Sequence, residues 1–202
     1  QQEYWQECDL NNYKISKEII CDFNPDYIIH LAADVTMDGK SLEDYKTNIK
    51  GVENIINILG CLAKNITLLV ASTQHVKKPG SFIYTSKNKY SPLGLYGKSK
   101  VITEDLIEKS DLKQNWFIFR PTLIWGPGNL IMANTIFNYI YKNIYYHPKI
   151  DNTVRSYGYI DNACNQIINL CTLDSKKIKN RVFYLADSNL LQREWISLAN
   201  IL

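Results

Sequence analysis

The sequence predicts an α/β fold with a doubly wound parallel sheet. Two observations carry this prediction: short apolar runs rich in β-branched residues, and helical stretches of about ten residues or more that alternate with them. Apolar runs of this kind suit strands that are buried on both faces, as in a parallel sheet. The chain has 202 residues, of which 46% are apolar, and this length is enough to bury a sizeable core.

The first half of the chain carries the clearest pattern. The first strand is expected over residues 26–33 (DYIIHLAA), and Ser41 with Asp44 then forms an acidic capping box that opens a long helix. Apolar residues between Val52 and Leu62 fall mostly at helical spacing and continue this helix. The next elements expected are a strand over 66–71 (ITLLVA), a helix over 97–109 and a strand over 116–119 (WFIF).

The second half of the chain is less regular. The sequence GPGN at 126–129 predicts a turn. The elements expected after it are a helix over 130–142, a strand over 154–160, a helix over 162–173, a strand over 181–186 and a helix over 192–202. No internal repeat and no long linker interrupts this order.

Composition narrows the function classes. The net charge of +3 is too small to predict binding to nucleic acid or to an anionic membrane. No segment reaches the roughly 18 uninterrupted apolar residues of a membrane span. The five cysteines, an odd number without a C-x-x-C pair, predict buried free thiols in a reducing cytoplasm and no metal site.

Ligands of such sheets bind beyond the carboxyl ends of the strands, so the residues directly after each strand are the candidate ligand contacts. The first strand runs into small alanines, against which a flat ligand can lie. The second ends in two hydroxyls, Ser72 and Thr73, and the third in Arg120 and Pro121.

Tyr96 and Lys100 lie between the second and third strands, at the start of a helix. The Tyr-x-x-x-Lys spacing alone is not informative, because chance predicts about one match and the sequence holds three. Pro148 disfavours a continuous helix from Tyr145 to Lys149, and no hydroxyl-bearing strand end precedes Tyr13 and Lys17. Positions i and i+4 share one helix face, so Tyr96 and Lys100 can meet one ligand.

The chemistry predicted for this set is hydride transfer coupled to proton transfer. A tyrosine hydroxyl ionises near pH 10, and lowering its pKa to near 7 needs about 4 kcal/mol. A nearby lysine ammonium ion and a cationic nicotinamide ring have the sign of charge needed. The alternative is a surface helix with a Tyr and a Lys of no catalytic role.

The motifs described above follow one another in the order found in a known family. In this respect the chain resembles the extended short-chain dehydrogenase/reductases, specifically the NAD-dependent epimerase/dehydratase family. The resemblance runs from Asp9 to about Trp195 and implies a Rossmann-like fold with NAD as cofactor. It implies catalytic roles for Thr73, with Ser72 beside it, and for Tyr96 and Lys100. The residues that it implies for cofactor binding are Asp9, Leu10, Leu31, Ala32, Ala33, Asn48, Tyr96, Lys100 and Pro121.

Two later stretches, RPTLIWGPGN and RSYGYIDNACNQI, resemble nucleotide-sugar enzymes of this family. They imply Asn129 and Arg155, together with Thr73, as substrate-binding residues, with Arg155 on the diphosphate. His147 is placed near the substrate pocket by the resemblance alone. His30 and His75 are expected to be structural.

The resemblance implies an epimerase that oxidises a sugar carbon to a ketone and returns the hydride to the other face, with Tyr96 as base. Dehydration is disfavoured, because Gln74 and His75 stand where dehydratases carry an Asp-Glu pair. Ser86, in the strand-like SFIYTS, is the alternative catalytic hydroxyl. The alternative functions are another NAD(P)-dependent reductase or dehydratase of the family, or a non-catalytic remnant.

The family's Gly-rich phosphate loop has no counterpart, because none of the nine glycines forms G-x-G-x-x-G. We therefore expect an internal fragment that lacks the first two strands and, by itself, binds NAD weakly. The expected regions are a partial NAD-binding domain over 1–128 and part of a smaller C-terminal substrate-binding region over 129–202. In relatives, homodimers form through helices that here correspond to about 41–64 and 97–109.

Overall fold

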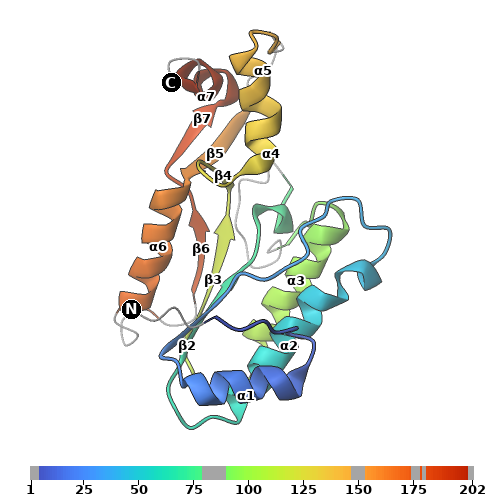
Figure 1. Cartoon of the computed structure of the whole chain (residues 1–202), viewed down its shortest axis with the longest axis vertical. Coiled ribbons are helices and arrows are strands. Elements are labelled where there is room, and N and C mark those ends of the chain that lie inside the picture. Colours follow the sequence, from blue (N-terminus) through green and yellow to red (C-terminus); the bar gives the residue numbers. More distant parts are fainter. Residues whose placement is uncertain (1–4, 79–89, 147–152, 174–177, 179–180, 200–202) are drawn as a thin grey trace. The chain divides into compact units, whose positions relative to one another are not determined.

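The computed structural model describes residues 5–78, 90–146, 153–173, 178 and 181–199 (Figure 1). The chain divides into two compact units. Unit 1 comprises Gln1–Arg120 and Leu173–Phe183, and unit 2 comprises Pro121–Thr172 and Tyr184–Leu202.

Unit 1 is built on the parallel sheet that the sequence predicts. The strand order is β1-β2-β3-β6, with β1 at Tyr27–His30, β2 at Thr67–Ala71, β3 at Trp116–Pro121 and β6 at Arg181–Leu185; Pro121 and the last two residues of β6 belong to unit 2. β2 is parallel to both β1 and β3, with Ile29 opposite Leu69 and Leu69 opposite Phe117. The carboxyl ends of these three strands therefore lie at one edge of the sheet.

Two long helices, α2 (Lys46–Gly60) and α3 (Gly94–Glu108), lie side by side in this unit (Figure 1). The predicted capping box of Ser41 and Asp44 is present, although it opens a short 3-10 turn, Leu42–Tyr45, that leads into α2. The two helices bury their apolar residues against alternate positions of β2 and β3. The core formed in this way consists of Val52, Ile55, Leu59, Ile66, Leu68, Val70, Ile107, Trp116 and Ile118.

Unit 1 departs from the prediction in two places. Helix α1 (Tyr13–Phe23) was not predicted; Asn12 caps it by accepting a hydrogen bond from the Ile15 N–H at 3.2 Å. The prediction that the first strand is buried on both faces was wrong: in β1, His30 is buried, but Tyr27 and Ile29 are 47% and 42% exposed. The reason is positional, because β1 is the edge strand of the described sheet.

Unit 2 contains a second, three-stranded sheet of order β4-β5-β7, where β4 is Leu123–Trp125, β5 is Val154–Tyr159 and β7 is Ser188–Leu191. β5 is parallel to β4 and antiparallel to β7. The short strands β4 and β7 were not predicted, because three or four residues give too little periodicity. The predicted helices correspond to α4 (Leu130–Met132), a π-helical turn (Ala133–Phe137), α5 (Asn138–Tyr141), α6 (Ile160–Thr172) and α7 (Gln192–Ala199).

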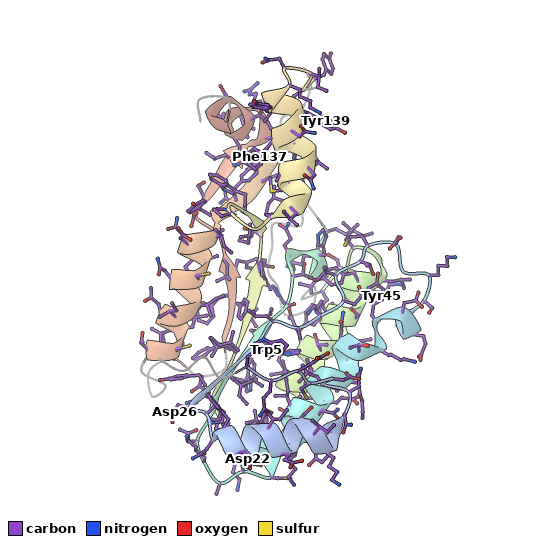
Figure 2. All side chains as sticks on the ribbon, viewed as in Figure 1. Trp5, Asp22, Asp26, Tyr45, Phe137 and Tyr139 are labelled. Carbon is purple, nitrogen blue, oxygen red and sulfur yellow. The ribbon has the colours of Figure 1, made fainter. Side chains whose placement is uncertain are left out.

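The core of unit 2 is aromatic. Trp195 stacks on Tyr157 with ring centroids 4.8 Å apart, and it also packs against Trp125 at 6.0 Å and Phe137 at 5.6 Å. Phe137 and the more exposed Tyr139 are labelled in Figure 2. Met132 and Ile196 complete this cluster.

The cysteines differ from the prediction in their burial. All five are free thiols, as expected, but Cys21, Cys61 and Cys164 are exposed and Cys8 and Cys171 are half-buried. The prediction of buried thiols was wrong because these cysteines lie mostly on the outer faces of helices and at helix ends. In the part of the chain that the structure describes, no helix is long and apolar enough to cross a membrane.

Candidate active site

The two hydroxyls directly after β2 point in different directions, as neighbouring residues of an extended strand must. The Thr73 hydroxyl lies close enough to Tyr96 to lower the pKa of its phenol, and the Thr73 oxygen accepts a hydrogen bond from the His75 N–H at 3.2 Å. The Ser72 hydroxyl instead donates to Glu104. The structure therefore brings Thr73, and not Ser72, to Tyr96.

Helix α3 presents Tyr96, Lys100 and Glu104 at successive four-residue intervals, so that the three side chains lie along one face. All three are buried, with relative exposures of 8%, 3% and 1%. Gly97 lets this helix approach the turn after Thr73, because a Cβ atom there would clash with the carbonyl oxygen of His75. The close approach places Tyr96 beside Thr73.

Lys100 is a buried cation beside the end of β2. Its ammonium group donates to the Ala71 carbonyl oxygen at 2.9 Å. Burial lowers the pKa of Lys100 to about 8, against an opposing contribution from the negative charge of Glu104. Lys100 is therefore mostly protonated at pH 7 but is close to the range in which it can lose its proton.

The hydroxyl of Tyr96 is in a dry environment. Burial raises its pKa, while the nearby Thr73 hydroxyl acts in the opposite direction. The ring packs against Tyr45, at 6.1 Å between centroids, and against His75, at 6.2 Å (Tyr45 is labelled in Figure 2). In this state Tyr96 holds its proton and is a potential proton donor.

Glu104 and Arg120 form a fully buried ion pair behind Lys100. Arg120 donates through Nε to Oε1 at 2.8 Å and through Nη2 to Oε2 at 2.6 Å, and its side chain has no exposure. The Tyr90 hydroxyl donates to Oε2 at 3.0 Å. Glu104 and Tyr90 were not predicted as site residues, although a glutamate four residues after Lys100 on an apolar helix face was a detectable signal.

His30 and His75, which the sequence leads us to expect as structural residues, both lie close to the candidate site. His30 is buried at the end of β1, where burial first and the charge of Lys100 second lower its pKa to about 4. Burial also lowers the pKa of His75. Both side chains are therefore neutral at pH 7 and serve as packing groups beside Tyr96 and Lys100.

The loop after β1 holds the residues predicted to line the cofactor. Leu31 and Ala32 are exposed and Ala33 is half-buried, so this short stretch presents one large apolar side chain and one small one at the surface. Asn48 shapes the loop from α2: its Oδ1 accepts from the Asp34 N–H at 2.7 Å, and its Nδ2 donates to the Asp34 carbonyl at 2.9 Å. Both ends of the Asn48 amide are thus used to hold the backbone of one residue.

The segment with Asp9 and Leu10 is fixed to α2 by Asn54, whose amide donates to the Leu10 carbonyl at 2.7 Å. The Asp9 carboxylate is exposed and accepts a hydrogen bond from the Asn11 N–H at 2.9 Å. The Leu10 side chain lies near Gly51, which also faces the His30 ring. Leu10 and the end of β1 are therefore neighbours along α2.

The remaining predicted site residues lie in unit 2, apart from two that the structure does not describe. Asn129 caps α4 by accepting from the Met132 N–H at 3.0 Å, and the Arg155 Nε donates to Gln192 at 2.9 Å. Pro121 ends β3 and is half-buried. Ser86 and His147 lie outside the described residues.

The site in unit 1 has the parts needed for proton transfer to or from a substrate oxygen. Tyr96 supplies a hydroxyl proton, Thr73 a second hydrogen-bonding hydroxyl and Lys100 a positive charge one helical turn away. Across the described ranges, no group of three or more His, Cys, Asp or Glu side chains is arranged to hold a metal ion.

Comparisons with known proteins place the chain in a family. Residues 3–143 match the family described as the RmlD substrate binding domain. A dTDP-4-dehydrorhamnose reductase from Aggregatibacter actinomycetemcomitans is 32% identical over 109 residues, which cover 51% of this chain and 36% of that relative. The match thus spans about a third of the length of the curated relative.

Solved structures of similar fold include the Bordetella bronchiseptica enzyme WbmG in complex with NAD, with a TM-score of 0.78 and 19% identity, covering 96% of this chain and 61% of that one. UDP-glucose 4-epimerase from Thermotoga maritima, with UDP-glucose, has a TM-score of 0.76 and 18% identity, covering 97% and 67%. At these identities the likeness concerns the fold, and the Rossmann-like α/β prediction is confirmed.

Proposed function

The chain belongs to the RmlD substrate binding domain family, and from this premise we propose that it takes part in the reduction of a keto group on a nucleotide sugar by a nicotinamide dinucleotide. The observation that supports the proposal most strongly is the buried hydroxyl pair of Thr73 and Tyr96, with Lys100 one turn along α3. The sequence motifs alone favoured an epimerase. We place reduction first because the relative that is 32% identical is a reductase.

The proposed roles follow from the position and the protonation state of each group. Tyr96 donates its phenolic proton to the carbonyl oxygen of the substrate as that oxygen becomes negative, and Thr73 holds the same oxygen by a hydrogen bond. Lys100, protonated at pH 7, stabilises the phenolate that remains. A reduced nicotinamide, when bound, supplies the hydride that the carbonyl carbon accepts.

The described residues of unit 1 fit such a cofactor in part. The small side chains of Ala32 and Ala33 leave the backbone after β1 open to a flat group, and Asn48 fixes the shape of that loop. We propose that Leu31 to Ala33, with Asp9 and Leu10, contact the adenosine half. We propose that Tyr96, Lys100 and Pro121 lie at the nicotinamide half, with NAD as the dinucleotide.

On the substrate side, we propose that Asn129 and Arg155 of unit 2 bind the nucleotide sugar, with the exposed guanidinium of Arg155 directed to its diphosphate. A guanidinium fork suits two phosphate oxygens, and the Gln192 contact supports the side chain without neutralising it. Dimer formation through α2 and α3 stays a prediction.

The second candidate function is epimerisation. It is favoured by the order of the motifs from Asp9 to Arg155, and the same Tyr96 would remove a hydroxyl proton while hydride passes to the oxidised nicotinamide and back. The residues required are the same in both reactions. What differs is the net change in the nicotinamide, which is consumed in reduction and regenerated in epimerisation.

The test uses the protein with dTDP-4-dehydrorhamnose and either NADH or NADPH, and in parallel with UDP-glucose and NAD, with each nicotinamide at a concentration that saturates the weak binding expected of this chain. Reduction predicts that one reduced nicotinamide is oxidised for each ketone lost. Epimerisation predicts a sugar epimer, seen by NMR, with no net oxidation of the sugar and no net reduction of NAD. Absence of both products, from folded protein, would contradict the proposal.

A further inference from the structure

The carboxylate of Glu104 is a junction of four hydrogen bonds within unit 1. Oε1 accepts from Arg120 Nε and from the Ser72 hydroxyl, and Oε2 accepts from Arg120 Nη2 and from the Tyr90 hydroxyl. Glu104 and Arg120 are 1% and 0% exposed in their side chains. A buried carboxylate is stable only when its oxygens are supplied with donors in this way.

The junction connects the elements that carry the candidate active site. Ser72 is the residue before Thr73, and Glu104 lies one helical turn beyond Lys100. Arg120 belongs to β3, which is paired with β2. A displacement of α3 along the sheet that separated Tyr96 from Thr73 would therefore also break bonds to Glu104.

We propose that Glu104 is a positioning residue for this site: with Arg120 it fastens α3 to the end of β2, so that Tyr96 meets Thr73, and it provides an opposite charge one turn from the ammonium group of Lys100. The proposal rests on the proposed function only in treating Tyr96 and Lys100 as the working groups. Its geometry does not depend on which reaction is catalysed.

The charge balance around Lys100 depends on few groups. His30 faces it from β1 and is neutral at pH 7, and Tyr96 lies on α3 itself. Arg120 on β3 and Tyr90 both bind Glu104, and His75 and Tyr45 pack on Tyr96. Among these described groups Glu104 is the acidic one, and its charge raises the pKa of Lys100 against the effect of burial.

The first test compares Glu104→Gln with Asp105→Asn, the same carboxylate-to-amide change one position along α3. Asp105 pairs with Lys109 on the exposed side of the helix. Lys100 is titrated by NMR in protein labelled at lysine Cε, and its signal is assigned by its loss in Lys100→Met. We expect its titration midpoint to fall by about one pH unit in Glu104→Gln and to stay unchanged in Asp105→Asn.

An unchanged midpoint in folded Glu104→Gln, or equal shifts in the two variants, would overturn the proposal. Glu104→Gln leaves Arg120 buried without its counter-ion and can prevent folding, so a second pair of variants tests the positioning directly. Ser72→Ala removes one bond to Glu104 and no charge. Ser99→Ala is its match, because Ser99 is equally buried on α3 and its hydroxyl donates to the Tyr96 carbonyl at 2.8 Å.

In Ser72→Ala we expect Thr73 to lie less close to Tyr96, and therefore a higher pKa of the Tyr96 phenol, measured by NMR of protein labelled at tyrosine Cζ. In Ser99→Ala we expect no change. Equal behaviour of the two variants would overturn the proposal. Both tests use the protein alone, so their failure is distinguishable from a failure to find reductase or epimerase products.

Discussion

The two units differ in what they bury. Every buried polar or charged side chain in the described part of the chain lies in unit 1, between Ser16 and Arg120, and this set includes Lys100 and Glu104. The buried residues described in unit 2 are apolar or aromatic, with Tyr157 and Trp195 at their centre. Unit 1 thus buries charged groups such as Lys100 and Glu104 at a cost of desolvation, as functional sites commonly do, whereas unit 2 is stabilised by ring packing.

The contrast also exists within unit 1. The core between the sheet and the helices α2 and α3 is apolar, whereas the buried charges of Lys100, Glu104 and Arg120 gather at the carboxyl ends of β2 and β3. The same strands thus contribute to the apolar core with their middle residues and to the candidate site with their carboxyl ends. Variants can separate the two contributions.

The largest effect on stability is expected from Trp195→Ala, which removes the central ring of unit 2. Loss of a buried tryptophan leaves a cavity and typically costs about 4 kcal/mol of unfolding free energy. Urea unfolding followed by circular dichroism measures the loss, with Tyr139→Ala, a 48% exposed ring, as the matched aromatic deletion of small effect.

Hydrogen exchange shows where Trp195→Ala acts. We expect faster exchange at amides of unit 2 and unchanged protection in β2 and α3. Equal loss of protection in both units would contradict the separation of an aromatic core from a polar site.

A smaller effect is expected from Lys100, and it depends on pH. Its folded pKa of about 8 lies below the ordinary value of 10.5, so the unfolded chain binds more protons between these pH values. The free energy of unfolding must therefore rise by about 3 kcal/mol as the pH increases from the folded pKa to the unfolded one. The same amount is lost again as the pH falls back to about 8. Denaturation of the wild type and of Lys100→Met at several pH values measures it.

Lys100→Met is expected to lack this rise and to be more stable than the wild type near pH 7, because the ammonium charge of Lys100 is then no longer buried. The stability of Lys100→Met is subtracted from that of the wild type at each pH. The contribution of the many tyrosines then cancels, because they titrate in both proteins. Parallel curves for the two proteins would show that Lys100 is not desolvated.

The next effect is on turnover and tests Thr73. Thr73→Val keeps the shape of the side chain and removes the hydroxyl, for which we expect a loss of about 100-fold in kcat. Thr122→Val is the matched change in unit 2, where the hydroxyl donates to the Leu185 carbonyl at 2.7 Å, and it should stay near the wild-type rate. Full turnover in Thr73→Val would assign the hydroxyl role elsewhere.

Much of the fold was predictable because β2, β3, α2 and α3 combine apolar runs with recognisable ends. The capping box at Ser41 is an example. Helix α1 was missed although Asn12 and the apolar residues Ile15, Ile19 and Phe23 gave a signal at four-residue spacing. The burial of β1 could not be read from its residues, because it depends on which strand forms the edge.

The residue types of the candidate site were predictable from the sequence. The directions in which their side chains point were less so. Thr73, Tyr96 and Lys100 follow from a strand end and a helix face. Adjacent residues of a strand point to opposite sides, and this rule already argued against Ser72 and Thr73 acting together. The partnership of Glu104 and Arg120 joins residues from a helix and a later strand, which no local pattern specifies.

The most direct test of a proton-transfer site in unit 1 is the turnover of Tyr96→Phe beside that of Tyr157→Phe. Both changes remove one hydroxyl from a buried ring, one in each unit. We predict that Tyr96→Phe loses about 1,000-fold in kcat while it stays folded, and that Tyr157→Phe retains near wild-type turnover. Equal rates for the two variants would contradict the assignment of proton transfer to Tyr96.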